Sequence, residues 1–311
     1  MVETPAVDVL RELLERQRQA IARSQPGVRD GSDAEELHRF RVATRRSRAL
    51  IRAARPLIRD QLAPLDRELR WLGGASGPSR DRDVLIEHIR GLLDDLEPDQ
   101  AGAQSIIAGL ERERLDERQA LLRAIDSDRF GELLVRFADA LKDLVAFDDE
   151  VGLRRLAERE LNRLRSAYEE LGSDPPDEEF HALRIKAKHA RYAVELAARA
   201  EGRPLTSLLD ALRELQDVIG AHQDAVVAER RVRALAGQDS ALAAGRIVEL
   251  QRRRRLEARA RVPELYRRIR RAGEQALYGA KHSGRDHAER SASRSSHPPD
   301  TTAHAARRGT R

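Results

Sequence analysis

The sequence predicts an all-α protein made of two similar helical halves, and three observations support this. Aromatic residues make up 3% and charged residues 36% of the chain, a composition typical of long amphipathic helices. Runs of β-branched residues, which favour strands, are nearly absent. One stretch of His, basic, Gly and Asp positions recurs 143 residues further along the chain.

The individual helices are predicted from apolar residues at helical spacing between breaks that carry Gly, Pro, Ser or Asp. Pro26-Gly27 ends the first helix, and a capping-box pattern from Ser32 to Glu35 starts the next. A clear break covers residues 172–176. The expected helices span about residues 6–23, 32–55, 61–72, 80–93, 101–125, 129–146, 153–171, 177–200, 205–218, 222–235 and 242–277.

The internal repeat organises these helices into two halves. Residues 35–41 match residues 178–184, which places His38 opposite His181. The match continues without a gap to Val84, and it pairs Arg45 with Lys188, Arg48 with Arg191, Gly77 with Gly220 and Asp81 with Asp224. We therefore expect one domain over residues 1–279, with pseudo-twofold related halves at about 1–146 and 150–279. Residues 280–311 lack apolar periodicity and are expected to form a disordered basic tail.

A one-sign charge stripe follows the first repeated helix. At about 100° per residue, its basic residues fall within an arc of roughly 80° and rise about 20 Å. They are His38, Arg41, Arg45, Arg48 and Arg52, and the second copy carries His181, Arg184, Lys188 and Arg191. Such a stripe is often only a solvated face. However, residues 37–59 contain no acid, and a duplicated one-sign stripe is stabilised by a counter-anion, so a linear polyanion is favoured.

Bulk charge does not identify the partner. The chain holds 58 Lys+Arg and 53 Asp+Glu, and seven of these bases and three of these acids lie in residues 281–311. The body is nearly neutral, so only the arrangement of charge can select a polyanion. The absence of cysteine suits a reducing compartment, and no signal peptide or bilayer-spanning run is evident, so a cytoplasmic protein is expected.

Four segments resemble the motifs of a known family. Glu36–Arg48 and Phe180–Tyr192 are similar to the two signature helices of the CHAD family, the conserved histidine α-helical domain. Gly77–Val84 resembles its glycine-arginine-aspartate loop, and Leu215–Asp224 resembles the counterpart in the second half. The resemblance covers about Val7–Leu277. It implies two helical bundles around a basic cavity that binds inorganic polyphosphate, and association with polyphosphate granules. No cofactor is expected.

The stripes and the resemblance together define a candidate binding set. The expected polyphosphate-binding residues are His38, Arg41, Arg45, Arg46, Arg48, Arg52, Arg80, His181, Arg184, Lys186, Lys188, Arg191, Tyr192 and His222. Asp81 and Asp224 are expected to cap the following helices and to orient the cations of the stripes. His88 has no counterpart in the repeat and is expected at the surface.

Two alternatives stay open. A metal-dependent phosphohydrolase could use the repeated His and Asp residues, but His38 and His181 have no second ligand at i+3 or i+4 and are flanked by cations. A nonspecific nucleic-acid binder could use the dense basic helix around residues 252–271, although aromatic residues for base stacking are scarce. No paired carboxylates, nucleophile motif or phosphate loop indicates an enzyme. The oligomeric state is not determined by the sequence.

Overall fold

The computed structural model describes residues 5–31, 33–147, 152–200 and 205–278, and this part of the chain is helical without strands, as predicted. The α-helices are α1 (Ala6–Asp30), α2 (Ala34–Ala53), α3 (Arg55–Ile58), α4 (Ala63–Arg90), α5 (Gln100–Ile125), α6 (Asp128–Lys142), α7 (Leu153–Glu169), α8 (Asp177–Ala200), α9 (Thr206–Leu235) and α10 (Ala241–Gly273). Short turns complete the described fold at η1 (Asp94–Leu96), η2 (Gln238–Ser240) and the π-helical η3 (Glu274–Tyr278).

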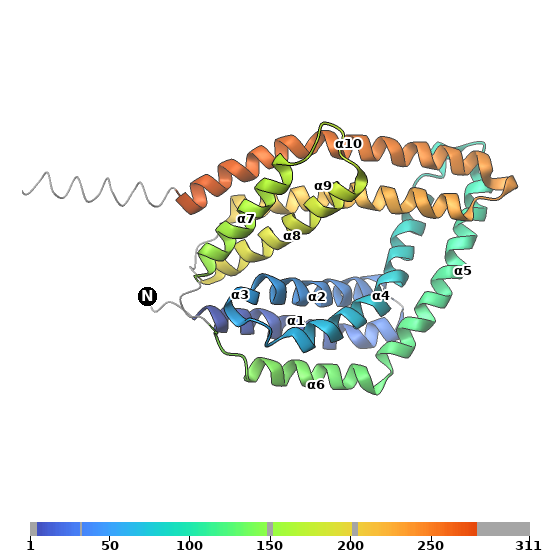
Figure 1. The fold of residues 1–311 in the computed structure, drawn as a ribbon. Helices are drawn as coiled ribbons and strands as arrows, with labels where there is room; N and C mark the ends of the chain where they lie inside the picture. Colours follow the sequence, from blue (N-terminus) through green and yellow to red (C-terminus); the bar gives the residue numbers. More distant parts are fainter. Residues whose placement is uncertain (1–4, 32, 148–151, 201–204, 279–311) are drawn as a thin grey trace, which may run out of the picture.

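The helices form two lobes. Helices α1, α2, α3, α6 and the first part of α4 make the lower lobe in Figure 1, α7 to α10 make the upper lobe, and α5 runs along one end. Helix α1 packs on α2, α2 on α4 and α4 on α5, while α7 packs on α8, α8 on α9 and α9 on α10. The same order of packing therefore recurs, and α2 contacts α8 where the lobes meet. That the two halves superpose as one duplicated unit stays a prediction.

Two separate apolar cores leave a polar belt between them. Helix α4 contributes Leu72 to the larger core and Leu85 to the smaller one, and α9 contributes Ile219 and Ala228 in the same way. Between these positions both helices carry mainly small, polar or charged side chains, and their valines, Val84, Val226 and Val227, belong to neither core. The belt agrees with the sequence, because neither helix has a leucine, isoleucine or phenylalanine there to join the cores.

Helices α4 and α9 run unbroken through the predicted loops, so these loop predictions were wrong. Helix α4 contains Gly73, Gly74, Gly77 and Pro78, and α9 contains Gly220. Packing against neighbouring helices on several sides outweighs the poor helix propensity of these residues. Gly77 also permits close approach, since a Cβ there would lie 2.9 Å from a guanidinium nitrogen of Arg41 on α2.

The first helix is also longer than predicted. Helix α1 continues through Pro26 because Val28 is still buried, and it ends at Gly31, whose φ of 76° is left-handed. Asp33 caps α2 by accepting a hydrogen bond from Glu35 N at 2.8 Å. Ser32 and the predicted tail at 280–311 lie outside the described residues. None of the described helices combines the length and the apolar character that crossing a bilayer requires.

Candidate functional site

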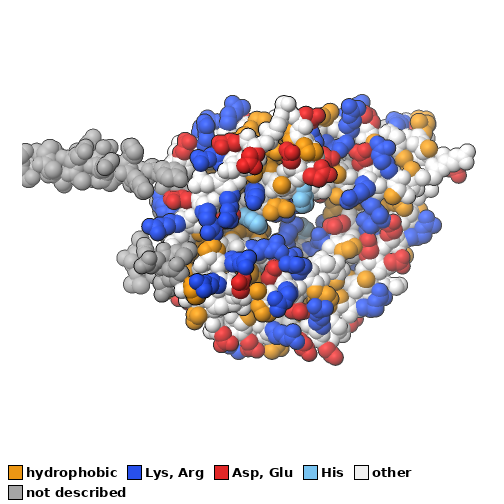
Figure 2. Space-filling model, in the orientation of Figure 1, with side chains coloured by type: hydrophobic (Ala, Val, Ile, Leu, Met, Phe, Trp, Pro, Cys, Tyr) orange, Lys and Arg blue, Asp and Glu red, His pale blue; other side chains and the backbone are white. Residues whose placement is uncertain are grey.

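Basic side chains from both halves meet in the polar belt. We call this group the central cluster, and its members are Arg41, Arg45, Arg80, Asp81, Arg184, Lys188 and Asp224. The field of Arg45 on α2 acts on Arg184 and Lys188 of α8, so the two stripes face each other across the junction. Figure 2 shows Lys and Arg side chains around a hollow at the centre of the molecule, with His side chains beside it.

On the first half, Arg41 is held in a fixed position. Its Nη1 donates to the carbonyl oxygen of Ser76 at 3.0 Å, and its Nη2 donates to Asp81 Oδ1 at 3.0 Å. Burial lowers the pKa of Arg41 below its ordinary value, which Asp81 opposes and the nearby Arg45 and Arg80 reinforce. As predicted, Asp81 orients a stripe cation. Its predicted capping role was wrong, because Asp81 lies inside α4.

On the second half, the cations are less well compensated. Burial lowers the pKa of Lys188 from 10.5 to about 7, and the charges of Arg184, Arg45 and Arg191 add to this effect. Burial likewise raises the pKa of Asp224, although Arg184 acts in the opposite direction. The Asp224 residue is exposed to solvent overall, but enough protein lies around its carboxylate for burial to raise the pKa. The charges of Arg184, Arg254 and Lys188 all act on this carboxylate, so it belongs to the central cluster. Asp224 also lies inside α9, so its predicted capping role was wrong too.

The repeated histidines occupy the outer edge of the stripes. His38 is exposed one turn before Arg41. His181 is also exposed, and its Nδ1 lies 3.1 Å from Gln223 Oε1, the residue next to Asp224. This contact fixes His181 beside the central cluster. That both histidines face one shared cavity stays a prediction.

Arg191 and Tyr192 lie at the inner end of the second stripe. The guanidinium of Arg191 lies 4.8 Å from the ring centre of Tyr192, which is buried. The charge of Arg191 still acts on Lys188. Arg191 therefore adjoins the central cluster, whereas the tyrosine ring supports it from within the core.

Arg46 and Lys186 are predicted site residues that lie away from the central cluster. Arg46 forms an ion pair with Glu195 that joins α2 to α8. Lys186 lines a shallow groove along α7 together with Arg155 and Arg159. The periodicity of the stripe already placed Lys186 off the cationic arc.

Arg48 and Arg52 continue the first stripe beyond the central cluster. The Nε of Arg48 donates to Asp66 Oδ1 at 3.0 Å, and an Nη of Arg52 lies 3.6 Å from the other oxygen of this carboxylate. Arg70 makes a third contact with Asp66 at 3.5 Å. The carboxylate of Asp66 therefore contacts three arginines, Arg48, Arg52 and Arg70.

His222 is buried in this fold and packs within the second half, and its predicted contact with polyphosphate stays a prediction. The side chain is 1% exposed, and its ring stacks on Phe180 with centroids 4.8 Å apart. Nε2 of His222 accepts a hydrogen bond from Arg259 Nε at 3.1 Å. Burial lowers the pKa of His222, so the neutral ring is favoured. The residue lies in the middle of α9 and not at a helix start.

Helix α10 supplies functional neighbours that the sequence did not identify. Arg255 and Arg259 both pair with Asp177, at 3.0 and 2.8 Å, and the charge of Arg254 acts on Asp224. His88, expected at the surface, lies half-buried with Nε2 3.1 Å from Gln251 Oε1. The basic run of α10 was the available signal, but its spacing alone could not show that one face turns inward.

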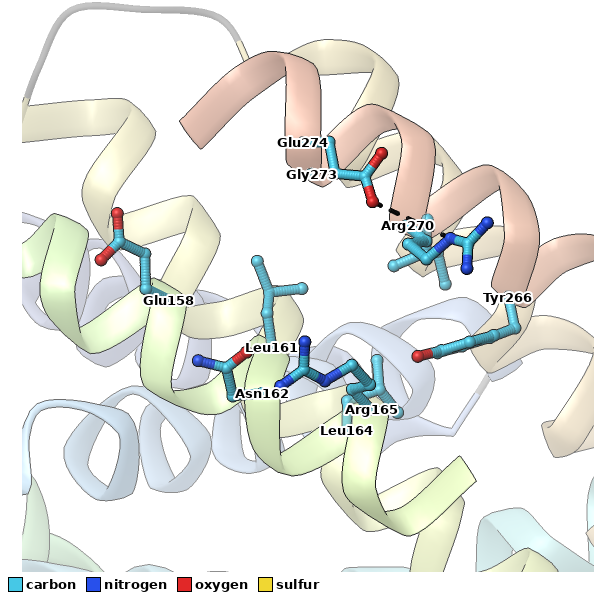
Figure 3. Close-up of a pocket in the computed structure, with 10 residues that line it drawn as sticks. Glu158, Leu161, Asn162, Leu164, Arg165, Tyr266, Arg270, Gly273 and Glu274 are labelled. Carbon is cyan, nitrogen blue, oxygen red and sulfur yellow. Dashed lines mark ion pairs between the residues drawn. The ribbon is translucent and has the colours of Figure 1, made fainter. Parts of the chain in front are cut away.

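A small pocket between α7 and α10 lies apart from the central cluster. Figure 3 shows the side chains that line it, among them Leu161, Tyr266 and Arg270. Its volume is about 120 Å³, and the guanidinium of Arg270 points to Glu274 at 3.9 Å. A cleft with a much larger volume of about 930 Å³ lies at the far end of the first stripe.

Comparisons with known proteins agree with the architecture. The family model described as the CHAD domain matches residues 12–233. Two uncharacterized proteins of Mycobacterium tuberculosis, from strains CDC 1551 and H37Rv, are 28% identical over 254 residues, which is 74% of this chain and 46% of theirs. The chain thus spans about half the length of these curated relatives.

Two solved structures share the fold. PptA from Streptomyces chartreusis superposes with a TM-score of 0.71 at 21% identity, over 85% of this chain and 100% of that one. The CHAD domain from the plant Ricinus communis superposes with a TM-score of 0.63 at 24% identity, over 87% of this chain and 92% of that one. The superpositions establish a common helical fold, and at identities this low they establish nothing further.

Proposed function

The chain belongs to the CHAD family, and from this premise we propose that it binds inorganic polyphosphate in the central cluster. The observation that carries the proposal is the gathering of cations from both halves close enough to lower one another's pKa, with Asp81 and Asp224 as the acids that act on them. Their mutual repulsion is relieved when an anion with many regularly spaced charges enters.

The individual side chains suit phosphate oxygens. Arg41 presents a guanidinium already fixed by two hydrogen bonds, so little conformational freedom is lost when it contacts a ligand. Arg45 is exposed at the centre of the cluster, and Lys188 adds a point charge from the opposite helix. A linear chain of phosphates can contact both stripes at once because the stripes face each other.

The nucleic-acid alternative is less well supported. The exposed arginines of α10 are engaged in pairs one turn apart, such as Arg253 with Glu249 and Arg267 with Glu264. Arg255 and Arg259 are directed to Asp177. This helix therefore offers few unpaired cations to a nucleic-acid backbone, and the residual attraction is nonspecific.

We further propose that the chain binds its ligand without catalysis, in the cytoplasm and on polyphosphate granules. Incubation with polyphosphate, followed by measurement of released phosphate and remaining chain length, tests the first point. A fluorescent fusion imaged in cells with and without polyphosphate synthesis tests the second. Granule foci that persist without polyphosphate would contradict it.

The decisive experiment compares a variant that lacks four cations of the central cluster with a control variant that lacks the same number of cations on α10. Replacement of Arg41, Arg45, Arg184 and Lys188 by alanine should weaken polyphosphate binding by on the order of 100-fold, because four phosphate contacts are lost. The matched control replaces exposed arginines of α10, namely Arg252, Arg253, Arg267 and Arg270. Circular dichroism verifies the helix content of both variants. Equal losses in the two folded variants would reject the central cluster as the site.

A further inference from the structure

The cleft at the far end of the first stripe is a second strongly basic feature of the molecule. It lies where the end of α2, α3 and the start of α4 face α7 and α8, and its volume is about 930 Å³. We call it the end cleft. Seven arginines line it, among them Arg55, Arg67 and Arg159, against the three acids Asp60, Asp66 and Glu160.

Two carboxylates of the end cleft, those of Asp66 and Glu160, lie deep in it, whereas Asp60 and most of the arginines lie at its opening, where Arg55 pairs with Asp60 at 2.9 Å. The side chain of Glu160 is 5% exposed and that of Asp66 14%, whereas Arg55 and Arg70 are 70% and 64% exposed. Each buried acid is shared, Glu160 between two arginines and Asp66 among three. The opening carries excess positive charge because the seven arginines of the end cleft outnumber its three acids.

The end cleft is continuous with the central cluster along two helices. On α2, Arg45 and Arg52 are two turns apart, a rise of about 10 Å. Asp66 joins these turns because it contacts both Arg48 and Arg52. On α8, Lys188 belongs to the central cluster and the adjacent His189 lines the end cleft. A linear polyanion that leaves the central cluster along α2 meets Arg48 and then Arg52.

We propose that the end cleft is a second binding segment for the same polyphosphate chain, so that affinity rises steeply once the chain is long enough to occupy both. This inference rests on the proposed function of the central cluster. It assigns a role to arginines of α3, α4 and α7 that lie outside the duplicated stripes. The ligand recognised there is a run of phosphate groups, since seven arginines line the end cleft against three acids.

The test uses exposed arginines whose loss leaves no buried acid without a partner. The variant Arg55→Gln, Arg67→Gln and Arg159→Gln keeps Arg163 on Glu160 at 2.7 Å. Its matched control carries Arg252→Gln, Arg253→Gln and Arg267→Gln on α10. Binding is titrated with polyphosphates of graded defined length. For long chains the end-cleft variant should lose about tenfold in affinity and about two units of the log–log salt slope. The shortest chains that bind should be unaffected.

Occupancy can be observed directly because the chain has no cysteine. An Ala63→Cys variant labelled with an environment-sensitive dye reports on the lining of the end cleft. Its emission should change with long chains and not with the shortest ones. Equal affinity of the end-cleft variant and its control for every length, or a dye that never responds, overturns the inference. Failure of the wild-type protein to bind any length would instead refute the proposed function.

Discussion

Polyphosphate binding should weaken with rising pH because Lys188 loses its proton near neutrality in the free protein. Burial and the charges of Arg184, Arg45 and Arg191 lower the pKa of this lysine to about 7. A bound polyanion favours the charged form, so binding takes up a proton. If the complex holds Lys188 fully protonated, affinity falls about tenfold between about pH 6 and about pH 8.

The assay is a titration at several pH values with long chains, whose terminal phosphates are few. Isothermal calorimetry in buffers of different ionisation enthalpy measures the proton uptake at the same time. Lys188→Arg keeps the charge at every pH and should remove most of the pH dependence. Lys188→Met should bind weakly throughout. His38 and His181 are retained in all three proteins, so their contribution cancels in the comparison.

One result would refute the assignment of the titrating group to Lys188. If Lys188→Arg shows the same pH dependence and the same proton uptake as the wild-type protein, then Lys188 is not the titrating group. The unliganded protein offers a second check. A lysine whose pKa is lowered by folding destabilises the native state while protonated, so this cost should disappear as the pH rises from about 7 toward 10.5. Relative to wild type, Lys188→Met should therefore be more stable at neutral pH and lose that advantage at alkaline pH.

Further changes separate binding from stability. Gly77→Ala should weaken polyphosphate binding several-fold in titrations, because its Cβ would lie 2.9 Å from Arg41 Nη1, whereas Gly74→Ala meets nothing within 4 Å and should bind normally. In urea denaturation both alanines should raise helix stability by about 1 kcal/mol. His222→Ala should lower the free energy of unfolding by about 2 kcal/mol, since buried contacts on α8 and α10 are lost. In the wild-type protein the stability linked to neutral His222 should decline as the pH falls below the ordinary value for histidine, because burial lowers its folded pKa and the unfolded chain takes up the proton first. Removal of residues 279–311, which hold seven basic and three acidic side chains, should leave polyphosphate affinity within about twofold and reduce binding to competitor DNA. A large loss of polyphosphate affinity on truncation would place the site in that segment.

Local sequence information was sufficient to predict most of the helices and which residues share one face of α2 and of α8. The period of 3.6 residues placed Arg41 and Arg45 on one face of α2, and Arg184 and Lys188 on one face of α8, where the structure has them. It failed at Gly77 and Gly220. Propensity predicts a break at glycine, but neighbouring helices stabilise an unbroken helix at both positions.

The composition, the all-α class, the duplicated stripes and the resemblance to the CHAD family were determined by the sequence itself, because helix periodicity and motif spacing are local properties. Only the tertiary structure decided which cations stay available. Arg46 is engaged by Glu195, and His222 is buried between Phe180 and α10. The end cleft exists because α3 and α7 come together across more than ninety residues of chain. Ion pairing and burial depend on contacts between elements that are distant in sequence, and no local pattern specifies those contacts.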